Sequence, residues 1–353
     1  MGIASDCYNK LLESDLEHIL VHTSDLWSNL KDSTIFVTGG TGFFGKWFLE
    51  TFAYANQEKA ANLRVIILSR DPDKFLKQYP HFGNNASFKF IKGDVRDFPY
   101  PDEPIHYVIH AATESSGKLN IEDPLLMFDT IVNGTLNVLN LAKQKNPKAF
   151  LFTSSGAVYG KQPPDITHVT EDYKGGPDTT NFRSAYSEGK RAAELLCSVF
   201  HERWHVGIKI ARCFAFVGPY LPLGGHFAIG NFIGNALRDE NITILGDGTQ
   251  HRSYLYAADL VIWLYTILLK GVSNRPYNVG SDKDVSIHEL AQHVNKVNSK
   301  VVVKVLGKST TGALAERYVP SIDRARDELY LDCFVSLDNA IRQTFEFNMT
   351  TKN

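Results

Sequence analysis

The sequence predicts an α/β protein built on a doubly wound parallel sheet, followed by a smaller α/β domain. Short apolar runs typical of buried parallel strands alternate with stretches whose apolar residues recur at helical spacing. A glycine-rich turn joins the first of these strands to the helix after it, and no repeat or long linker interrupts the alternation. With 353 residues, 43% of them hydrophobic, the chain is long enough for one large domain and a smaller one.

The overall composition argues against several classes of partner. The formal net charge of −2 provides no global attraction to nucleic acid or to an anionic membrane surface. No uninterrupted apolar run reaches the roughly 18 residues that a membrane-spanning helix needs, so we expect no membrane insertion. The four cysteines form no CxxC pair and the chain opens without a signal-peptide pattern, which indicates reduced thiols and a cytoplasmic protein.

Residues 1–32 are expected to form a helical extension. Apolar residues such as Leu16, Ile19 and Leu20 recur among charged ones at helical spacing. We expect this extension to pack on the surface of the large domain, and a partner-binding arm is the alternative.

The stretch 34–49, TIFVTGGTGFFGKWFL, organises the large domain, which we expect to span residues 33–212. It predicts a strand, a tight turn and the start of a helix. Gly39 and Gly42 allow the backbone to turn sharply and approach a pyrophosphate, and Gly45 allows the helix to pack close to the strand. A tight turn that binds no ligand would contain the same glycines. The other residues predicted to line this cofactor turn are Thr41, Phe43 and Phe44.

The second strand, 63–68, ends in polar residues that bear on the choice of dinucleotide. In a dinucleotide-binding fold this strand end faces the adenosine ribose, where a carboxylate accepts the 2′-hydroxyl of NAD and an arginine suits the phosphate of NADP. Ser69 and Arg70 stand at that end and favour NADP. Asp71 follows them, so NAD remains the alternative cofactor. A solvated arginine that binds no ligand is the alternative.

Two further strand ends complete the expected cofactor site. The run 88–91 leads into Asp94 and Val95, which suit the edge of an adenine. The run 107–109 leads into small residues, which allow the ribose and diphosphate of the cofactor to lie close to the backbone. These small residues are Ala111, Ala112 and Thr113.

Two later stretches contain groups that can transfer protons. The first, TSSGAVYG at 153–160, stands at the carboxyl end of a strand, where open α/β sheets bind ligands. The second opens a helix with Tyr186 and Lys190, which share one helical face because they are four residues apart. A free tyrosine has a pKa of about 10, so a nearby ammonium group is needed to stabilise its phenolate near neutral pH. A serine hydroxyl bonded to the same substrate oxygen would complete the proton transfer as a nicotinamide accepts hydride.

From its first strand to its end, the sequence resembles the extended short-chain dehydrogenase/reductase family of nucleotide-sugar epimerases and dehydratases. The motifs that carry the resemblance are TGGTGFFG, HAAT, NGT, SSGAVYG, YSEGK, GDGTQHR and YNVGS. The resemblance implies a Rossmann domain, bound NAD or NADP and a nucleotide-diphosphate sugar as substrate. It places Ser155 at the catalytic and substrate-contacting serine position, with Tyr186 as the base and Lys190 as its partner, both also contacting the cofactor. It further implies a homodimer formed through helices at 124–143 and 186–200.

Departures from the family pattern indicate which reaction to expect. The family's 4,6-dehydratases carry an Asp-Glu pair directly after the catalytic residue, and the decarboxylases that resemble them carry a glutamate there. Gly156 and Ala157 occupy these positions here, and neither can donate or accept a proton. We therefore expect an epimerase that transfers hydride at C4 of the sugar. The alternatives, in order of preference, are an NADPH-dependent ketoreductase, a dehydratase or decarboxylase, and a non-catalytic dinucleotide sensor. Ala215 replaces the family's sugar-contacting asparagine, so the sequence does not predict which sugar is bound.

From about residue 213 the sequence changes to loops rich in glycine, proline and aromatic residues. This change predicts a mainly substrate-binding domain at 213–353, with some segments that return to the large domain. The resemblance places Arg252 on the substrate diphosphate and Arg317 as a second clamp, since guanidinium groups pair well with phosphate oxygens. Ordinary surface arginines are the alternative. The residues expected in the nucleotide pocket are Phe227 and Asn231.

One motif invites a metal assignment that we reject. His201, Glu202 and His205 fit the H-E-x-x-H pattern, in which two histidines one helical turn apart bind zinc. The motif stands at the end of the helix that begins near Tyr186, where a glycine and a strand follow, and no third ligand is apparent. We expect a partly exposed helix end and no metal site.

Overall fold

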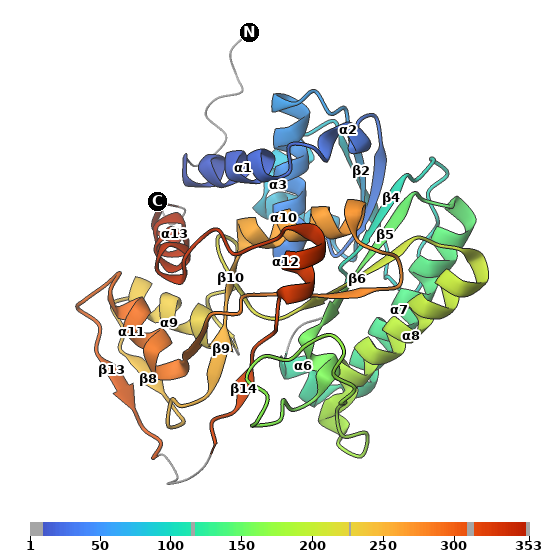
Figure 1. Cartoon of the computed structure of the whole chain (residues 1–353). Helices are drawn as coiled ribbons and strands as arrows, with labels where there is room; N and C mark the ends of the chain where they lie inside the picture. The colour runs from blue at the N-terminus through green and yellow to red at the C-terminus, as the bar shows by residue number, and fades with distance from the viewer. Residues whose placement is uncertain (1–9, 114–116, 226, 309–313, 351–353) are drawn as a thin grey trace.

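The computed structural model describes residues 10–113, 117–225, 227–308 and 314–350 (Figure 1). Its centre is a seven-stranded sheet in the order β11-β6-β5-β4-β1-β2-β3, in which every neighbouring pair is parallel. The strands are β1 Thr34–Thr38, β2 Arg64–Ser69, β3 Phe88–Lys92, β4 Tyr107–His110, β5 Ala149–Ser155, β6 Ile208–Cys213 and β11 Pro276–Val279. The predicted doubly wound parallel sheet is confirmed.

The strand order reverses between β1 and β4, which lie side by side although β2 and β3 separate them in the chain. Thr38 at the end of β1 pairs with His110 at the end of β4. Open α/β sheets bind ligands at such a switch point, outside the carboxyl ends of the strands. The glycine turn after β1 and the residues after β4 therefore occupy the expected place for a ligand.

Helices cover both faces of the sheet (Figure 1). α7 Pro124–Lys145 and α8 Ala185–Trp204 lie against one face, and α3 Phe43–Glu58 and α10 Ala257–Lys270 lie against the other. Side chains alternate along each strand, so β1 directs Phe36 towards α7 and the residues on either side of it towards α3. The sheet is therefore buried between two apolar cores.

Helix α7 is the one described helix that is long and apolar enough to cross a membrane. Core helices meet the same criteria, and 44% of its most apolar window is buried. Met127, Ile131 and Val138 of α7 are buried in the core beside the sheet. The apolar character of α7 thus reflects in part its packing against the sheet and against α8.

A smaller group of sheets and helices is built mainly from the chain after β6. It contains the three-stranded sheet β12-β9-β14 and the strand pair β8 and β13. Its elements are α9 Ala228–Leu237, β8 Ile242–Ile244, β9 His251–Ser253, β12 Asp284–Ser286, α11 Ile287–Asn295, β13 Val303–Val305, β14 Arg317–Tyr318 and α13 Leu337–Thr350. Between them the chain returns to the large sheet through α10 and β11, and α12 Asp323–Leu329 contacts β11.

The N-terminal helix α1 Lys10–His22 packs against α10 and α3. Asp15 of α1 is buried there and accepts a hydrogen bond of 2.5 Å from the Tyr256 hydroxyl. Residues 1–9 of the expected extension lie outside the described residues. The remaining short elements are α2 Trp27–Leu30, α4 Pro72–Gln78, α5 Pro80–Gly83, α6 Gly117–Glu122, β7 Phe216–Val217, β10 Leu255–Tyr256 and the 3-10 turns η1 Gly156–Tyr159 and η2 Phe182–Ser184.

Candidate active site

The glycine turn after β1 is closed to side chains at two positions. Gly39 has a φ of 73°, and a Cβ atom built there would lie 2.4 Å from the Ala111 carbonyl oxygen. A Cβ atom on Gly45 would lie 2.3 Å from the Gly39 carbonyl oxygen. Gly39 has a left-handed backbone conformation that favours glycine, and the absence of a side chain at Gly45 allows the start of α3 to pack against the turn.

The amino end of α3 presents backbone amides without a side-chain cap. Gly42 is the N-cap residue, and the first turn contains no acidic residue. The amides and dipole of a helix favour an anion at such an end, so the residues present fit the diphosphate of a dinucleotide. Thr41 is partly exposed in this turn. The Phe44 ring packs against Phe216 at a centroid distance of 5.2 Å, with Phe43 beside it.

The end of β2 separates the roles of the two charged residues that follow it. Ser69 is buried as the last residue of β2, and Arg70 is exposed. The Asp71 carboxylate caps α4, because it accepts a hydrogen bond of 3.1 Å from the Lys74 amide. Arg70 and Asp71 are both exposed, but the Asp71 carboxylate is engaged as a helix cap and therefore has a structural role.

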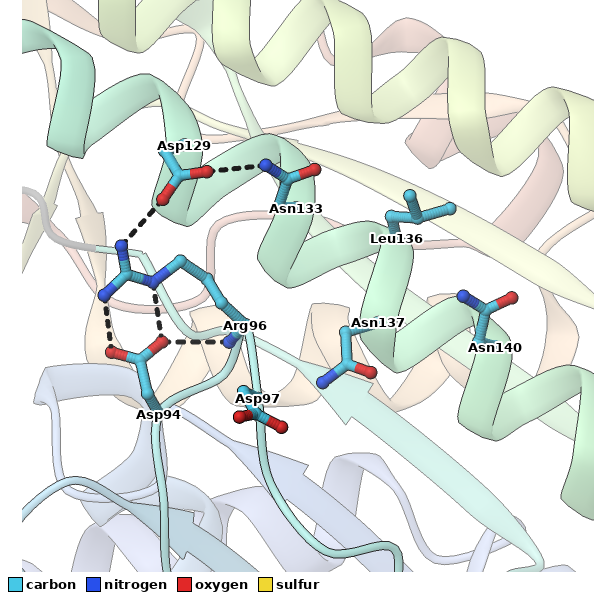
Figure 2. Close-up of a pocket in the computed structure, with 8 residues that line it drawn as sticks. All are labelled: Asp94, Arg96, Asp97, Asp129, Asn133, Leu136, Asn137 and Asn140. Atoms are coloured by element: carbon cyan, nitrogen blue, oxygen red, sulfur yellow. Dashed lines mark hydrogen bonds and ion pairs between the residues drawn. The ribbon is translucent and has the colours of Figure 1, made fainter.

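Asp94, the predicted adenine contact, lies in a polar cluster that lines a hollow beside α7 (Figure 2). Arg96 donates to the Asp94 carboxylate at 2.9 and 3.0 Å and to Asp129 at 2.7 Å. The hydrogen bonds from Arg96 hold the pKa of Asp94 below its usual range. Val95 is buried in the core beneath this loop. The sequence analysis did not include Arg96, although it stands beside the residues that were chosen.

The backbone after β4 lies directly beside the glycine turn. The Ala111 amide donates to the Thr38 carbonyl and the Ala112 amide to the Thr38 hydroxyl, both at 3.1 Å. Buried His110 joins the Thr38 hydroxyl to Thr135 of α7, at 2.7 and 3.0 Å. Burial lowers the pKa of His110 to about 3, so its ring is neutral near pH 7 and links β1 to α7.

The structure brings the predicted catalytic serine and tyrosine together at the carboxyl end of β5. Ser155 is the last residue of β5, and Tyr186 lies in the first turn of α8. Burial raises the pKa of the Tyr186 phenol, and a hydrogen bond with the Ser155 hydroxyl partly offsets that rise. The Ser155 oxygen also accepts a hydrogen bond of 3.1 Å from the Ala157 amide. The two hydroxyls are thus placed to share one substrate oxygen.

Lys190 lies one helical turn beyond Tyr186 and is buried, with 2% of its surface exposed. Its ammonium group donates hydrogen bonds of 2.7 Å to the Thr113 hydroxyl and to the Thr153 carbonyl. It also lies 4.9 Å from the centre of the Phe152 ring. Burial lowers the pKa of Lys190 to about 8. Lys190 and Tyr186 share one face of α8, and the hydrogen bonds of the ammonium group go to Thr113 and Thr153.

A second phenol lies at the same serine, and the sequence analysis missed it. Burial raises the pKa of the Tyr318 phenol of β14, and the nearby Ser155 hydroxyl partly opposes that rise. Its ring centre lies 4.7 Å from that of Phe214 and 5.9 Å from the Arg252 guanidinium carbon. Tyr318 directly follows Arg317, but it stands far along the chain from Ser155, and no local pattern places it at that serine. Only the pairing of β14 with β9 brings it to the site.

The two predicted phosphate arginines lie on different sides of their small sheet. Arg317 donates to the Asp284 carboxylate at 2.6 Å, and His251 contacts the same group at 2.5 Å. Arg252 instead lies beside Tyr318 and donates to the His251 carbonyl at 2.8 Å. The strand register pairs Arg317 with His251 and Tyr318 with Arg252, and successive residues of a strand face opposite sides. The structure thus brings Arg252, and not Arg317, to the side of Ser155, the predicted catalytic serine.

The residues predicted for the nucleotide pocket lie at the start of α9. Asn231 accepts a hydrogen bond of 3.0 Å from the Gly225 amide and donates one of 2.5 Å to the Gly225 carbonyl. Its amide group therefore holds the preceding loop. Phe227, the residue before α9, keeps 43% of its surface exposed. Of these two side chains, the ring of Phe227 is the one that faces solvent.

Position 156 has no room for a side chain. A Cβ atom on Gly156 would lie 2.7 Å from the Phe214 ring. An acidic or basic side chain there would require the Phe214 ring to move. Ala157, the next residue, adds only a methyl group. The site therefore contains no acid or base at the two positions directly after Ser155.

The H-E-x-x-H motif lies at the carboxyl end of α8. His201 contacts the Val206 carbonyl through Nδ1 at 2.9 Å. His205 is the C-cap residue with a φ of 54°, which turns its side chain away from the direction that a helical residue would have. Within the described ranges, no three His, Cys, Asp or Glu residues are grouped so that they could hold a metal ion.

Comparisons of the sequence identify a family and its relatives. The profile of the NAD dependent epimerase/dehydratase family matches residues 35–280. The chain is 31% identical over 295 residues to UDP-glucuronic acid decarboxylase 6 of Arabidopsis thaliana, covering 84% of this chain and 82% of that protein. It is 28% identical over 314 residues to UDP-glucuronic acid decarboxylase 1 of Danio rerio, covering 89% and 72%.

Solved structures of similar fold come from enzymes with different names. UDP-glucuronic acid 4-epimerase from Bacillus cereus, in complex with NAD, aligns with a TM-score of 0.75 at 23% identity, covering 91% of this chain and 100% of that one. The dTDP-glucose 4,6-dehydratase from Bacillus anthracis, in complex with NAD, aligns with a TM-score of 0.74 at 19% identity, covering 91% and 97%. At these identities the likeness establishes the fold alone.

Proposed function

The chain belongs to the NAD-dependent epimerase/dehydratase family, and on that premise we propose that it is a nucleotide-sugar epimerase that transfers hydride at C4 of the sugar. The composition of the site carries this proposal. The Ser155 hydroxyl lies near enough to Tyr186 to lower the pKa of its phenol, and Lys190 is buried one turn beyond, whereas positions 156 and 157 offer no acid or base. Such a set can move one proton to and from a substrate oxygen, but it lacks the second acid and base that an elimination needs.

In this proposal the Tyr186 phenolate takes the proton of the C4 hydroxyl. The Ser155 hydroxyl, bonded to the same oxygen, orients the proton transfer, and the charge of Lys190 stabilises the phenolate. When bound, a nicotinamide dinucleotide supplies reversible hydride transfer at C4. The same Tyr186 hydroxyl returns the proton once C4 has been reduced from its other face, so the reaction needs no net oxidant.

We infer that the turn at 39–45 holds the diphosphate of the cofactor and that Arg70 favours NADP. The support is the uncapped amino end of α3 and the use of Asp71 as a helix cap. Arg70→Ser is expected to weaken NADP binding about tenfold and to leave NAD binding nearly unchanged, because a charged hydrogen bond to the 2′-phosphate is lost. Isothermal titration of both dinucleotides measures this, and equal weakening of the two would contradict it.

Asp71→Ala is the matched control for the same strand end. Loss of its cap to Lys74 is expected to lower the free energy of unfolding by about 1 kcal/mol without changing the ratio of NADP to NAD affinity. A change in that ratio would indicate that Asp71, and not Arg70, contacts the adenosine ribose.

For the substrate we propose a nucleotide-diphosphate sugar. Arg252 is the arginine on the side of Ser155, and no carboxylate among the described residues is ion-paired with it, in contrast to Arg317. A guanidinium group in that place suits the charge of a diphosphate. Several curated relatives are named for UDP-glucuronic acid, so UDP-sugars come first among the candidates.

An NADPH-dependent reductase of 4-keto sugars is the second candidate, and the exposed Arg70 favours it. The names of the relatives suggest decarboxylation as another candidate. The lack of an acid or base at Gly156 and Ala157 argues against it, and the Phe214 ring leaves no room for a side chain at position 156. The intact set of Ser155, Tyr186 and Lys190 argues against a non-catalytic dinucleotide sensor.

One experiment separates these reactions. The cofactor that copurifies with the protein is identified by mass spectrometry, and the protein is then incubated with a panel of nucleotide sugars. An epimerase yields an isomeric product with no net change in the cofactor, whereas a reductase consumes NADPH in step with product. Release of carbon dioxide from a UDP-uronic acid, or a product that has lost water, would overturn the epimerase proposal.

We also propose that the chain forms a homodimer through α7 and α8. The two helices pack against each other and still expose large apolar side chains on their outer surfaces. Leu125 is 82% exposed and Leu195 is 66% exposed. Burial of such residues against a second copy is favourable by the hydrophobic effect.

A further inference from the structure

The hydroxyl group of Thr113 is fixed in its orientation. It donates a hydrogen bond of 2.9 Å to the Ala112 carbonyl, which leaves its oxygen lone pairs to accept. The acceptor side receives the Lys190 ammonium group at 2.7 Å. Thr113 follows β4 at the switch point of the sheet, so this contact ties the β4 strand end to the catalytic helix α8.

The charged groups around Lys190 only partly offset the effect of burial, which lowers the pKa of its ammonium group. Glu194 of the same helix is paired with Arg212 at 2.7 and 3.0 Å. Burial raises the pKa of the Cys197 thiol of α8, and raises that of the Cys213 thiol of β6 to about 12, so both thiols are neutral near pH 7. His110 of β4 is also neutral, because burial lowers its pKa. In the proposed function, Tyr186 is the phenol whose ionised form Lys190 stabilises.

The hydrogen bonds of the Lys190 ammonium group therefore end on two neutral oxygens. One is the Thr153 carbonyl, which every residue at that position would provide. The other is the Thr113 hydroxyl, which depends on the side chain. A buried ammonium group with few ionic partners relies strongly on such acceptors.

We propose that Thr113 is a positioning residue for the proton transfer, whose hydroxyl oxygen keeps the Lys190 ammonium group charged and in place beside the Tyr186 base. This inference rests on the proposed function, because it concerns the same phenol. Thr113 acts through Lys190 and needs no contact with the sugar. Its contribution is electrostatic, in addition to any space that it leaves for a cofactor.

Loss of the acceptor has a defined effect on the pH dependence of turnover. Without the Thr113 oxygen, the protonated form of Lys190 is less stable, so the alkaline limb of the kcat profile moves to lower pH. The Tyr186 phenolate then has less support, so the acid limb moves to higher pH. Hydrogen bonds to charged groups predict shifts of about one pH unit on each limb and a fall in kcat of about tenfold.

The test compares Thr113→Val with Thr113→Ser. Valine keeps the shape of threonine and removes the oxygen, whereas serine keeps the oxygen. The expected result is a narrower pH profile for Thr113→Val and a profile close to that of the unmodified protein for Thr113→Ser. Identical profiles for all three proteins would overturn the inference. If the valine variant does not fold, Thr113→Ala removes the same oxygen without added bulk.

A second variant distinguishes electrostatics from loosening of the helix. Asn120 accepts a hydrogen bond of 3.0 Å from the Tyr186 amide and donates one of 2.8 Å to the Arg183 carbonyl. Asn120→Ala therefore weakens the start of α8 without touching the ammonium group. It is expected to lower kcat and leave both limbs in place. Equal shifts in Asn120→Ala and Thr113→Val would show that Thr113 has no specific role.

A measurement without substrate keeps this inference separate from the proposed function. Ultraviolet difference titration of the protein against Tyr186→Phe reports the ionisation of that phenol, and the same pair is compared in the Thr113→Val background. The phenol is expected to titrate about one pH unit higher when Thr113 is valine. An unchanged titration overturns the role of Thr113 alone, whereas full turnover by Tyr186→Phe overturns the proposed function.

Discussion

At the scale of single residues, the hydroxyl of Tyr186 is the group on which turnover should depend. Tyr186→Phe removes the proposed base and keeps the ring, so we expect kcat to fall by about 10²- to 10⁴-fold with cofactor binding retained. Steady-state kinetics and a dinucleotide titration measure the two effects. Tyr330→Phe is the control, because Tyr330 is 89% exposed, and it should leave both values unchanged. Normal turnover by Tyr186→Phe would remove Tyr186 from the mechanism.

The close packing around Gly156 predicts that a methyl group added at this position destabilises the protein. The added methyl of Gly156→Ala would lie 2.7 Å from the Phe214 ring, which itself packs 4.7 Å from Tyr318. We expect the free energy of unfolding to fall by about 1–3 kcal/mol, since the ring must shift, and kcat to fall with it. Urea denaturation and kinetics provide the measurement.

A matched glycine controls for the added methyl itself. Gly224 has nothing within 4 Å of a built Cβ atom. Gly224→Ala should therefore change the free energy of unfolding by less than about 0.5 kcal/mol. If Gly156→Ala were equally silent, the Phe214 ring would be mobile enough to admit a side chain at position 156.

At the scale of elements, the docking of α1 contains a buried carboxyl group that makes stability depend on pH. Burial raises the pKa of Asp15 to about 7, and its hydrogen bond from Tyr256 only partly opposes that effect. His18 of the same helix contacts Asp259 of α10 at 3.1 Å, which also places charge near Asp15. An unfolded aspartate has a pKa of about 3.9.

The sign of this dependence follows from where the proton is held. Between about pH 4 and pH 7 the folded protein retains a proton on Asp15 that the unfolded chain has lost, so the free energy of unfolding falls as pH rises through this window. In the Asp15→Asn variant, the side-chain amide oxygen can accept the same hydrogen bond from the Tyr256 hydroxyl, and the side chain carries no charge. Its stability relative to the unmodified protein should therefore rise from about pH 4 to pH 7 and then level off. Urea denaturation across this range measures it, and a difference independent of pH would contradict it.

At the scale of the whole molecule, the proposed dimer makes α7 and α8 a shared surface. Leu195→Asp places a charge among exposed apolar residues of α8 and is expected to shift the protein to a monomer in sedimentation equilibrium. Val272→Asp is the control, because Val272 is 55% exposed between α10 and β11 and should leave the assembly unchanged. A dimer that withstands Leu195→Asp would place the interface elsewhere.

The large sheet could be predicted from the sequence because its signals are local. The apolar runs of β1, β2 and β5 and the glycines at 39, 42 and 45 specify strands and a turn within a few residues. The pair Tyr186 and Lys190 needs only the helical repeat to share a face. These features depend on neighbours in the chain, which the sequence contains.

The partners of the site residues could not be predicted in the same way. Whether Arg252 or Arg317 lies beside Ser155 depends on the register of β9 with β14, and Tyr318 reaches the site only through that pairing. Likewise, no local pattern shows that Asp71 caps α4 or that Arg96 engages Asp94.

The sequence by itself determined the parallel sheet and the turn at the switch point, and it predicted the set of Ser155, Tyr186 and Lys190, because each follows from periodicity or from the chemistry of adjacent residues. The tertiary structure decided which arginine, which second phenol and which threonine lie around that set. Those choices depend on contacts between segments far apart in the chain, whose registers are set by the packing of the whole core.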